Sequence, residues 1–167
     1  MIRAYKNVAP TIAKDASIAE GAVVIGDVHI GAESNVWFGC VIRGDVNIIR
    51  IGSRTNIQDG TVIHVTRKTG PTIIGSGVTI GHSVLLHACT LEDDCFIAMH
   101  STIMDGAVVE SGAWVAAGAL VTPNKRILKG QIWGGNPARY LRDMKEEEKQ
   151  FIAISSKNYV ELAKDYL

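Results

Sequence analysis

The sequence is poor in aromatic side chains and has no excess of charge of either sign. Phe, Trp and Tyr make up 6% of the 167 residues, and 17 Lys and Arg balance 17 Asp and Glu. A formal net charge of zero, with no run of basic residues, argues against a nucleic-acid partner. Hydrophobic residues nevertheless reach 47%. The sequence therefore predicts a substantial core built from aliphatic side chains.

The sequence also lacks the signals of a membrane protein and of a disulfide-rich protein. No apolar run approaches the roughly 20 residues of a membrane span, and the first residues contain no apolar signal-peptide core. The cysteines are odd in number and have no Cys-x-x-Cys spacing; they are Cys40, Cys89 and Cys95. We therefore expect no membrane partner and a reducing, cytoplasmic location.

The sequence does contain an aliphatic residue at almost every sixth position. The series runs through Ile12, Ile18, Val24, Ile30, Val36, Ile42 and Ile48, resumes at Ile51, Ile57 and Ile63, returns at Ile74, Ile80 and Leu86, and ends with Leu91, Ile97, Ile103, Val109, Val115 and Val121. A period of six fits neither an α-helix nor a long alternating strand. It is typical of a parallel β-helix, in which short strands separated by turns each point a side chain inward. A β-sandwich would need longer strands and hairpin turns, which the sequence lacks.

The C-terminal residues follow a different period. From Asp143 onward the apolar residues recur at helical spacing, and Asp143 with Glu146 is predicted to form a capping box. We therefore predict a β-helix over residues 1–138. Residues 139–167 are predicted to contain an amphipathic helix that packs on the β-helix or on a neighbouring subunit.

Two of the five histidines occupy equivalent positions in the repeat, since His64 follows Ile63 and His87 follows Leu86. If three faces complete one coil and the intervening polar stretch is a loop, the two histidines stack on consecutive coils about 5 Å apart. His82 belongs to a different corner, from which it could not easily reach the pair within one chain but could reach the pair of another chain. Three imidazoles and one open position are the pattern of a catalytic zinc site, which predicts a metal between the subunits of a cyclic trimer. Alternatively, these are ordinary surface histidines of a structural solenoid.

Two polar segments, RGD and NIQD, precede the histidines. Arg43 could form a charge-assisted pair with Asp45 or with Asp59. Gln58 offers both a donor and an acceptor, which would suit it to orient a metal-bound hydroxide. The alternative interpretation is that these are turn residues with a solvated ion pair of little energetic value.

Three segments together resemble the γ-class carbonic anhydrase family: WFGCVIRGDVNIIRIGSRTNIQDGTVIHV (37–65), GHSVLLHAC (81–89) and GNPAR (135–139). The likeness extends from about Ile12 to the terminal helix, and it is closest to the short bacterial branch of carbonic anhydrase-like hexapeptide proteins. It implies a mainly β fold, a left-handed parallel β-helix with a C-terminal α-helix. It also implies a homotrimer with zinc, or another divalent metal such as iron or cobalt, between subunits.

The resemblance further implies roles for individual residues. His64 and His87 look like two metal ligands from one subunit, and His82 like the third ligand from its neighbour. The other implied site residues are Arg43 and Asp45 as an interface pair, Asp59 as their partner, Gln58 and Asn56 around the metal-bound water, and Tyr159 in the active site. The implied reaction is the reversible hydration of carbon dioxide to bicarbonate by a zinc-bound hydroxide.

Two features depart from the pattern of the archetypal members. Val46 stands where they carry Glu, and the loop Thr66–Pro71 lacks their acidic proton-shuttle residue. Fast turnover requires proton export, so we expect weak hydration that depends on buffer or on His100. Two other functions stay open: an acyltransferase or thioesterase that acts on acyl-CoA without a metal, and a non-catalytic, metal-stabilised trimeric scaffold.

Overall fold

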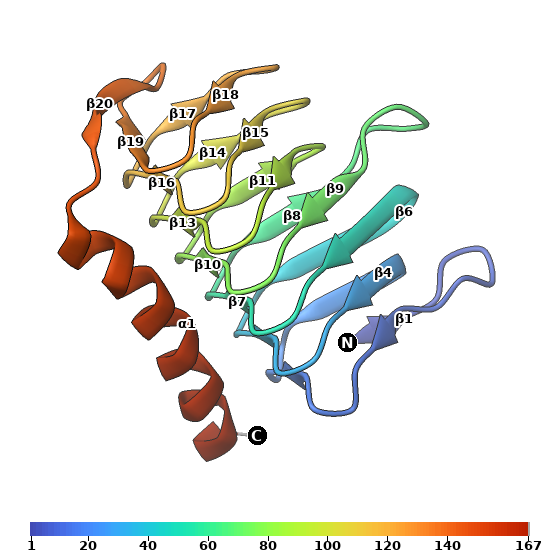
Figure 1. Ribbon diagram of the computed structural model, residues 1–167. Helices are drawn as coiled ribbons and strands as arrows, with labels where there is room; N and C mark the ends of the chain where they lie inside the picture. Colours follow the sequence, from blue (N-terminus) through green and yellow to red (C-terminus); the bar gives the residue numbers. More distant parts are fainter. Residues whose placement is uncertain (167) are drawn as a thin grey trace.

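The structure is a computed structural model that describes residues 1–166, and it consists of short strands wound into a β-helix with one helix along its side (Figure 1). The strands are β1 (Ile2–Arg3), β2 (Thr11–Ile12), β3 (Ser17–Ile18), β4 (Val23–Ile30), β5 (Asn35–Val36), β6 (Val41–Ile51), β7 (Asn56–Ile57), β8 (Val62–His64), β9 (Thr72–Ile74), β10 (Thr79–Ile80), β11 (Leu85–His87), β12 (Thr90–Leu91), β13 (Phe96–Ile97), β14 (Thr102–Ile103), β15 (Val108–Val109), β16 (Trp114–Val115), β17 (Leu120–Val121), β18 (Arg126–Ile127), β19 (Gln131–Gly134) and β20 (Arg139–Asp143). The helix is α1 (Glu146–Tyr166). The mainly β fold predicted from the period of six is confirmed.

Three ladders of parallel strands form the three faces of the β-helix. The first face contains β3, β5, β7, β10, β13, β16 and β19, and β20 extends it in the antiparallel direction. The second face contains β8, β11, β14 and β17, and the third contains β9, β12, β15 and β18. The long strands β4 and β6 run through a corner, so each belongs to both the second and the third face.

The predicted inward positions form the aliphatic core, and from Val24 onward all but one of them are buried. The exception is Ile48, which is half-buried, whereas its neighbour Ile49 is 0% exposed. The reason is a register shift between β4 and β6: Gly26 pairs with Gly44 and Val28 with Ile49. Four residues of β6 therefore lie opposite one residue of β4. We call these four, residues 45–48, the β6 insert.

The polar stretch after His64 leaves the coil as predicted. β8 ends at His64 and β9 begins at Thr72. Thr66 and Gly70 close the excursion with two backbone hydrogen bonds, of 2.8 and 3.2 Å. We call residues 65–71 the 65–71 loop. It leaves the β-helix at the corner that carries the two stacked histidines.

Helix α1 lies along the first face, against β5, β7 and β10 (Figure 1). Ser155 Oγ lies 3.0 Å from Thr79 Oγ1, and Ser156 Oγ donates a 2.6 Å hydrogen bond to the carbonyl oxygen of Arg54. The helix was predicted to pack on the β-helix or on a neighbouring subunit, and it packs on the β-helix of its own chain. Polar outward side chains of the first face are buried beneath it.

The start of the helix differs from the prediction. The expected capping box of Asp143 and Glu146 is wrong, because Asp143 accepts a 3.1 Å hydrogen bond from the Tyr140 hydroxyl. Instead, the N–H of Lys145 donates to Glu148 Oε2 at 2.8 Å, so the observed contact lies two residues later in the chain than the predicted pair. Residues 139–143 pair with β19, and this pairing keeps them extended, so the helix begins only after them.

The start of α1 is expected to be sensitive to acid. Two hydrogen bonds from Arg142 and one from the Lys145 N–H lower the pKa of Glu148 from 4.5 to about 2. A pKa lower in the folded than in the unfolded state means that Glu148 stabilises the fold above about pH 4.5 and loses this effect as the pH falls towards 2. Hydrogen exchange should therefore show the first turn of α1 opening over this range, and Glu148→Gln should abolish the pH dependence. Glu147→Gln is the matched control; an equal effect of that variant would contradict the assignment.

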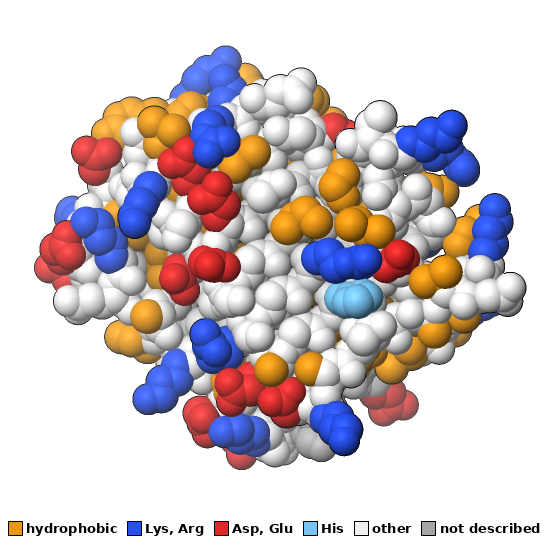
Figure 2. Space-filling model, turned by 45° about the vertical axis from the view of Figure 1, so that its right-hand side comes forward, with side chains coloured by type: hydrophobic (Ala, Val, Ile, Leu, Met, Phe, Trp, Pro, Cys, Tyr) orange, Lys and Arg blue, Asp and Glu red, His pale blue; other side chains and the backbone are white. Residues whose placement is uncertain are grey.

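The surface fits the balanced composition. On the face seen in Figure 2, acidic and basic side chains are interspersed without a large area of one sign. No helix within residues 1–166 is long and apolar enough to cross a membrane.

Candidate metal centre

His64 and His87 lie side by side on neighbouring coils. His64 ends β8, His87 ends β11, and the register of the two parallel strands pairs one histidine with the other. Their ring centroids are 5.3 Å apart, and His64 Nδ1 lies 3.3 Å from His87 Nε2. The predicted stacking of these histidines at one corner is therefore present.

Each of the two imidazoles has a carboxylate on its other nitrogen. His64 Nε2 lies 3.0 Å from Asp45 Oδ1, and His87 Nδ1 lies 2.7 Å from Asp105 Oδ1. Because a carboxylate is an acceptor, each of these ring nitrogens carries the proton. Arg43 forms a salt bridge with Asp45, so of its two predicted partners Arg43 contacts Asp45.

The nitrogens that face each other fit a metal ion. With the protons on the outer nitrogens, His64 Nδ1 and His87 Nε2 both present lone pairs across 3.3 Å, and two lone pairs attract only through a cation or a proton between them. Zinc–nitrogen bonds of 2.0–2.1 Å in a tetrahedral site place two ligand nitrogens about 3.3–3.4 Å apart. Carboxylates on the outer nitrogens are the usual support of histidine ligands. The donor set therefore suits zinc.

The two carboxylates remain charged at neutral pH. Burial raises the pKa of Asp45, but hydrogen bonds from His64 and Arg43 outweigh it and hold the pKa of this carboxyl below its usual range. Burial likewise raises the pKa of Asp105, and hydrogen bonds from Thr66 and His87 bring it below the usual range. Two negative charges thus flank the imidazole pair, which favours a cation between the rings.

His82 lies apart from this pair. It follows β10 at the corner between the first and second faces, and its Nδ1 lies 2.9 Å from Asp59 Oδ2. Asp59, predicted to be a partner of Arg43 and Asp45, therefore contacts His82. His100 lies one coil further on and donates its backbone N–H to the His82 carbonyl at 2.9 Å. Within residues 1–166, no three side chains of His, Cys, Asp or Glu are grouped so that they could hold a metal ion.

The remaining predicted site residues gather beside His82. Gln58 Nε2 donates a 3.0 Å hydrogen bond to Asn56 Oδ1, and both side chains are buried. Gln58, His82 and Tyr159 line one pocket of about 270 Å³ between the first face and α1. Burial, with a smaller contribution from the charge of Asp59, raises the pKa of Tyr159. The predicted site residues thus form two separate clusters, one around His64 and His87 and the other around His82.

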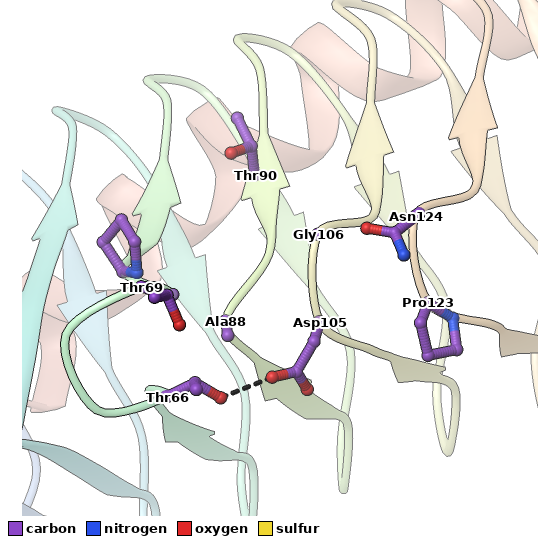
Figure 3. Close-up of a pocket in the computed structure, with 10 residues that line it drawn as sticks. Thr66, Thr69, Ala88, Thr90, Asp105, Gly106, Pro123 and Asn124 are labelled. Atoms are coloured by element: carbon purple, nitrogen blue, oxygen red, sulfur yellow. Dashed lines mark hydrogen bonds between the residues drawn. The ribbon is translucent and has the colours of Figure 1, made fainter.

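Sequence reasoning missed Asp105 and its partner Thr66. Thr66 Oγ1 donates a hydrogen bond to Asp105 Oδ2, drawn as the dashed line in Figure 3. A signal was available: Leu86 pairs with Ile103, so the polar residue two positions after Ile103 lies one coil beyond the His87 corner. A carboxylate on a neighbouring coil can be found by aligning the repeats and comparing the residues at the same corner of successive coils.

This arrangement defines a class, the hexapeptide-repeat β-helix proteins that carry a histidine-based candidate metal centre. No family model matches the chain. A solved structure of a hexapeptide transferase family protein from Anaplasma phagocytophilum superposes with a TM-score of 0.96 at 47% identity, covering 99% of this chain and 98% of that chain. The fold is thus found over the whole length of another protein.

Curated relatives identify the family. Gamma carbonic anhydrase 1, mitochondrial, of Arabidopsis thaliana is 56% identical over 160 residues, 93% of this chain, although the match spans 58% of the plant protein's length. A probable carbonic anhydrase of Methanocaldococcus jannaschii is 44% identical over 152 residues, which cover 91% of this chain and 95% of the relative. The chain belongs to the γ-carbonic anhydrase family, as its motifs indicated.

Proposed function

We propose that the protein is a metal-dependent carbonic anhydrase that hydrates carbon dioxide reversibly to bicarbonate, with its metal between the subunits of a homotrimer. The observation that supports this most directly is the pair of imidazole nitrogens 3.3 Å apart, each backed by a carboxylate, in a chain of this family. Zinc is the favoured ion because it accepts tetrahedral imidazole ligands; iron and cobalt are alternatives, since imidazole also suits other divalent transition metals.

An uncovered apolar stripe supports the trimer. On the second face, Val41, Val62 and Leu85 are registered side by side, and the last two are 38% and 39% exposed. Val62 and Leu85 each lie two residues before a histidine of the pair. Exposed apolar side chains next to one of these clusters are typical of a contact surface, and a cyclic arrangement of three copies repeats one such contact three times. We propose that this contact brings His82 of one copy to His64 and His87 of the next.

The chain's own residues then have distinct roles. When bound, zinc supplies a nucleophile at neutral pH by lowering the pKa of a water ligand to about 7. The aspartates hold the imidazoles in position. Gln58, whose amide nitrogen donates to Asn56 Oδ1, would orient that water through its amide oxygen. Apolar side chains of the pocket that Gln58 and His82 line, among them Phe96 and Met99, suit the nonpolar carbon dioxide molecule.

Two other functions compete with this proposal. The hexapeptide transferase relative favours acyl transfer or thioester hydrolysis on acyl-CoA, which needs a general-base histidine and no metal. A non-catalytic, metal-stabilised scaffold would have the same fold and the same ligands. The cysteines are free and buried, which fits a reducing location; we propose the cytoplasm.

Measuring the metal content together with the catalytic activity of the purified protein distinguishes the three functions. Protein purified with and without oxygen should contain about one metal ion per chain in a trimer, as expected for one site per interface. Stopped-flow assays should show carbon dioxide hydration that chelation abolishes and Zn²⁺ restores. A metal-free trimer that cleaves acyl-CoA would favour the second function, and a metal-loaded trimer without turnover would favour the scaffold. A metal-loaded monomer, seen by light scattering, would refute the interface site.

A further inference from the structure

We propose that Thr66 is a positioning residue that holds the metal ligand His87 through Asp105, and that it thereby couples the 65–71 loop to the metal centre. This inference rests on the proposed function, because it gives His87 the role of a ligand. Thr66 itself would touch neither metal nor substrate.

A single carboxylate connects the loop to the imidazole. Asp105 Oδ1 accepts from His87 Nδ1 at 2.7 Å, and Asp105 Oδ2 accepts from Thr66 Oγ1 (Figure 3). Both oxygens of Asp105 are therefore engaged, on opposite sides of the carboxyl group. The side chain of Asp105 is 42% exposed, so burial alone does not hold its rotamer. The hydroxyl of Thr66 supplies the second fixed point.

Thr66 is itself held from the other side. Its carbonyl oxygen accepts a 3.0 Å hydrogen bond from Asn47 Nδ2, which belongs to the β6 insert on the preceding coil. Its N–H and C=O are both bonded to Gly70 at the other end of the loop. Asp45, in the same insert, contacts His64. The insert and the loop, the two irregular parts of this corner, thus act on both histidines.

The loop is packed closely against the coil that carries His87. A Cβ atom on Gly70 would lie 2.7 Å from the Cβ of Ala88, the residue after His87, so only glycine permits this approach. Beyond the contact lies a pocket of about 340 Å³ lined in part by Thr66, Thr69 and Asp105 (Figure 3). The loop is therefore fixed at its base by the Thr66–Asp105 bond and by the close contact at Gly70.

Fixing Asp105 matters because it fixes the tautomer of His87. With the proton on Nδ1, Nε2 keeps the lone pair that a metal requires. If the carboxylate turns to solvent, the proton distributes between both nitrogens and the ring is free to rotate. Loss of an outer-shell partner typically weakens metal binding by 10–100-fold. We expect Thr66→Val to weaken metal binding by about tenfold and Asp105→Asn to weaken it by about 100-fold.

The test compares Thr66→Val, which removes the hydroxyl at nearly constant volume, with Thr66→Ser, which retains it. Thr69→Val, in the same loop and exposed, is the matched control. The first readout is the ¹⁵N NMR spectrum of the His87 ring in metal-free protein, which reports the tautomer. The second is the Kd for Zn²⁺ measured by competition with a chromophoric chelator. Thermal unfolding of the metal-free proteins checks that each variant folds.

The expected result is a mixed His87 tautomer and about tenfold weaker Zn²⁺ binding in Thr66→Val, with Thr66→Ser and Thr69→Val close to wild type. A Thr66→Val protein equal to wild type in both readouts, or a Thr69→Val protein with the same loss, would overturn the proposal. If Thr66→Val does not fold, Thr66→Ala, which removes the same hydroxyl, gives the same test. If wild-type protein binds no Zn²⁺, the proposed function fails, while the tautomer comparison still decides the role of Thr66.

Discussion

His82→Ala is expected to weaken Zn²⁺ binding by more than about 100-fold, the upper range for loss of an outer-shell partner, because a three-histidine site has no ligand to spare. His64→Ala and His87→Ala should have equally large effects. The result for His82 is the informative one, since His82 contacts Asp59 and lies apart from the other two histidines in the chain. Competition titration with a chelator measures the loss. His29→Ala, an exposed histidine on β4, is the control, and full metal occupancy in His82→Ala would refute the interface site.

Mixed trimers sharpen this test. If each site takes His64 and His87 from one copy and His82 from the next, neither His82→Ala nor His87→Ala protein binds metal alone. Unfolding and reassembling the two together should restore one site in every mixed trimer, or about a quarter of all sites for random mixing in equal amounts. A site built within one chain would give no restoration. Elemental analysis of the reassembled trimer distinguishes the two results.

If the proposed function holds, proton export is expected to limit carbon dioxide hydration by the wild-type protein. No acidic residue lies in the 65–71 loop, and Val46 stands in the β6 insert. Hydration should therefore accelerate as imidazole buffer is added, because free imidazole can carry the proton. Lys68→Glu should raise turnover at low buffer concentration, towards the 10²–10⁴-fold that a general acid–base typically contributes. Lys68 is exposed in the 65–71 loop, so the new carboxylate would reach water.

The matched control is Lys68→Gln, which has the shape of glutamate but exchanges no proton. Stopped-flow rates at several imidazole concentrations should show a smaller buffer dependence for Lys68→Glu than for Lys68→Gln. If a metal-loaded trimer stays inert at high imidazole concentration with either residue, the missing shuttle is not the cause. The scaffold or the acyl-CoA function would then be favoured.

The repeat could be predicted because every coil needs aliphatic residues at its inward positions, and these positions recur every six residues. Ile57, Ile63 and Ile80 are fully buried as expected, and the polar excursion is a loop. The error at Ile48 has a local cause: the β6 insert contains an Ile at the sixth position by coincidence, and the core takes Ile49 instead. Counting by six cannot detect an insertion that preserves an aliphatic residue at the counted position.

The contacts of the candidate site also fall into those that the sequence predicted and those that it did not. The stacking of His64 on His87 follows from counting coils, because both residues directly follow an inward side chain. The partner of Asp59 could not be predicted by counting residues. Asp59 lies in the corner after β7, where the direction of a side chain depends on the turn. Asp105 was missed because it is 39 residues from Thr66. Only the stacking of coils places these two side chains together.

The sequence alone determined the β-helix, the stacked histidines and the family, because these depend on a period and on motifs that are local in the chain. The tertiary structure decided which carboxylate faces which imidazole, and that Gln58 and Asn56 are buried near α1, with Gln58 at the pocket that His82 and Tyr159 also line. These contacts join residues of different coils, and the coils are offset by the β6 insert and the 65–71 loop. Their geometry exists only when the corners have formed and the helix has packed on the first face.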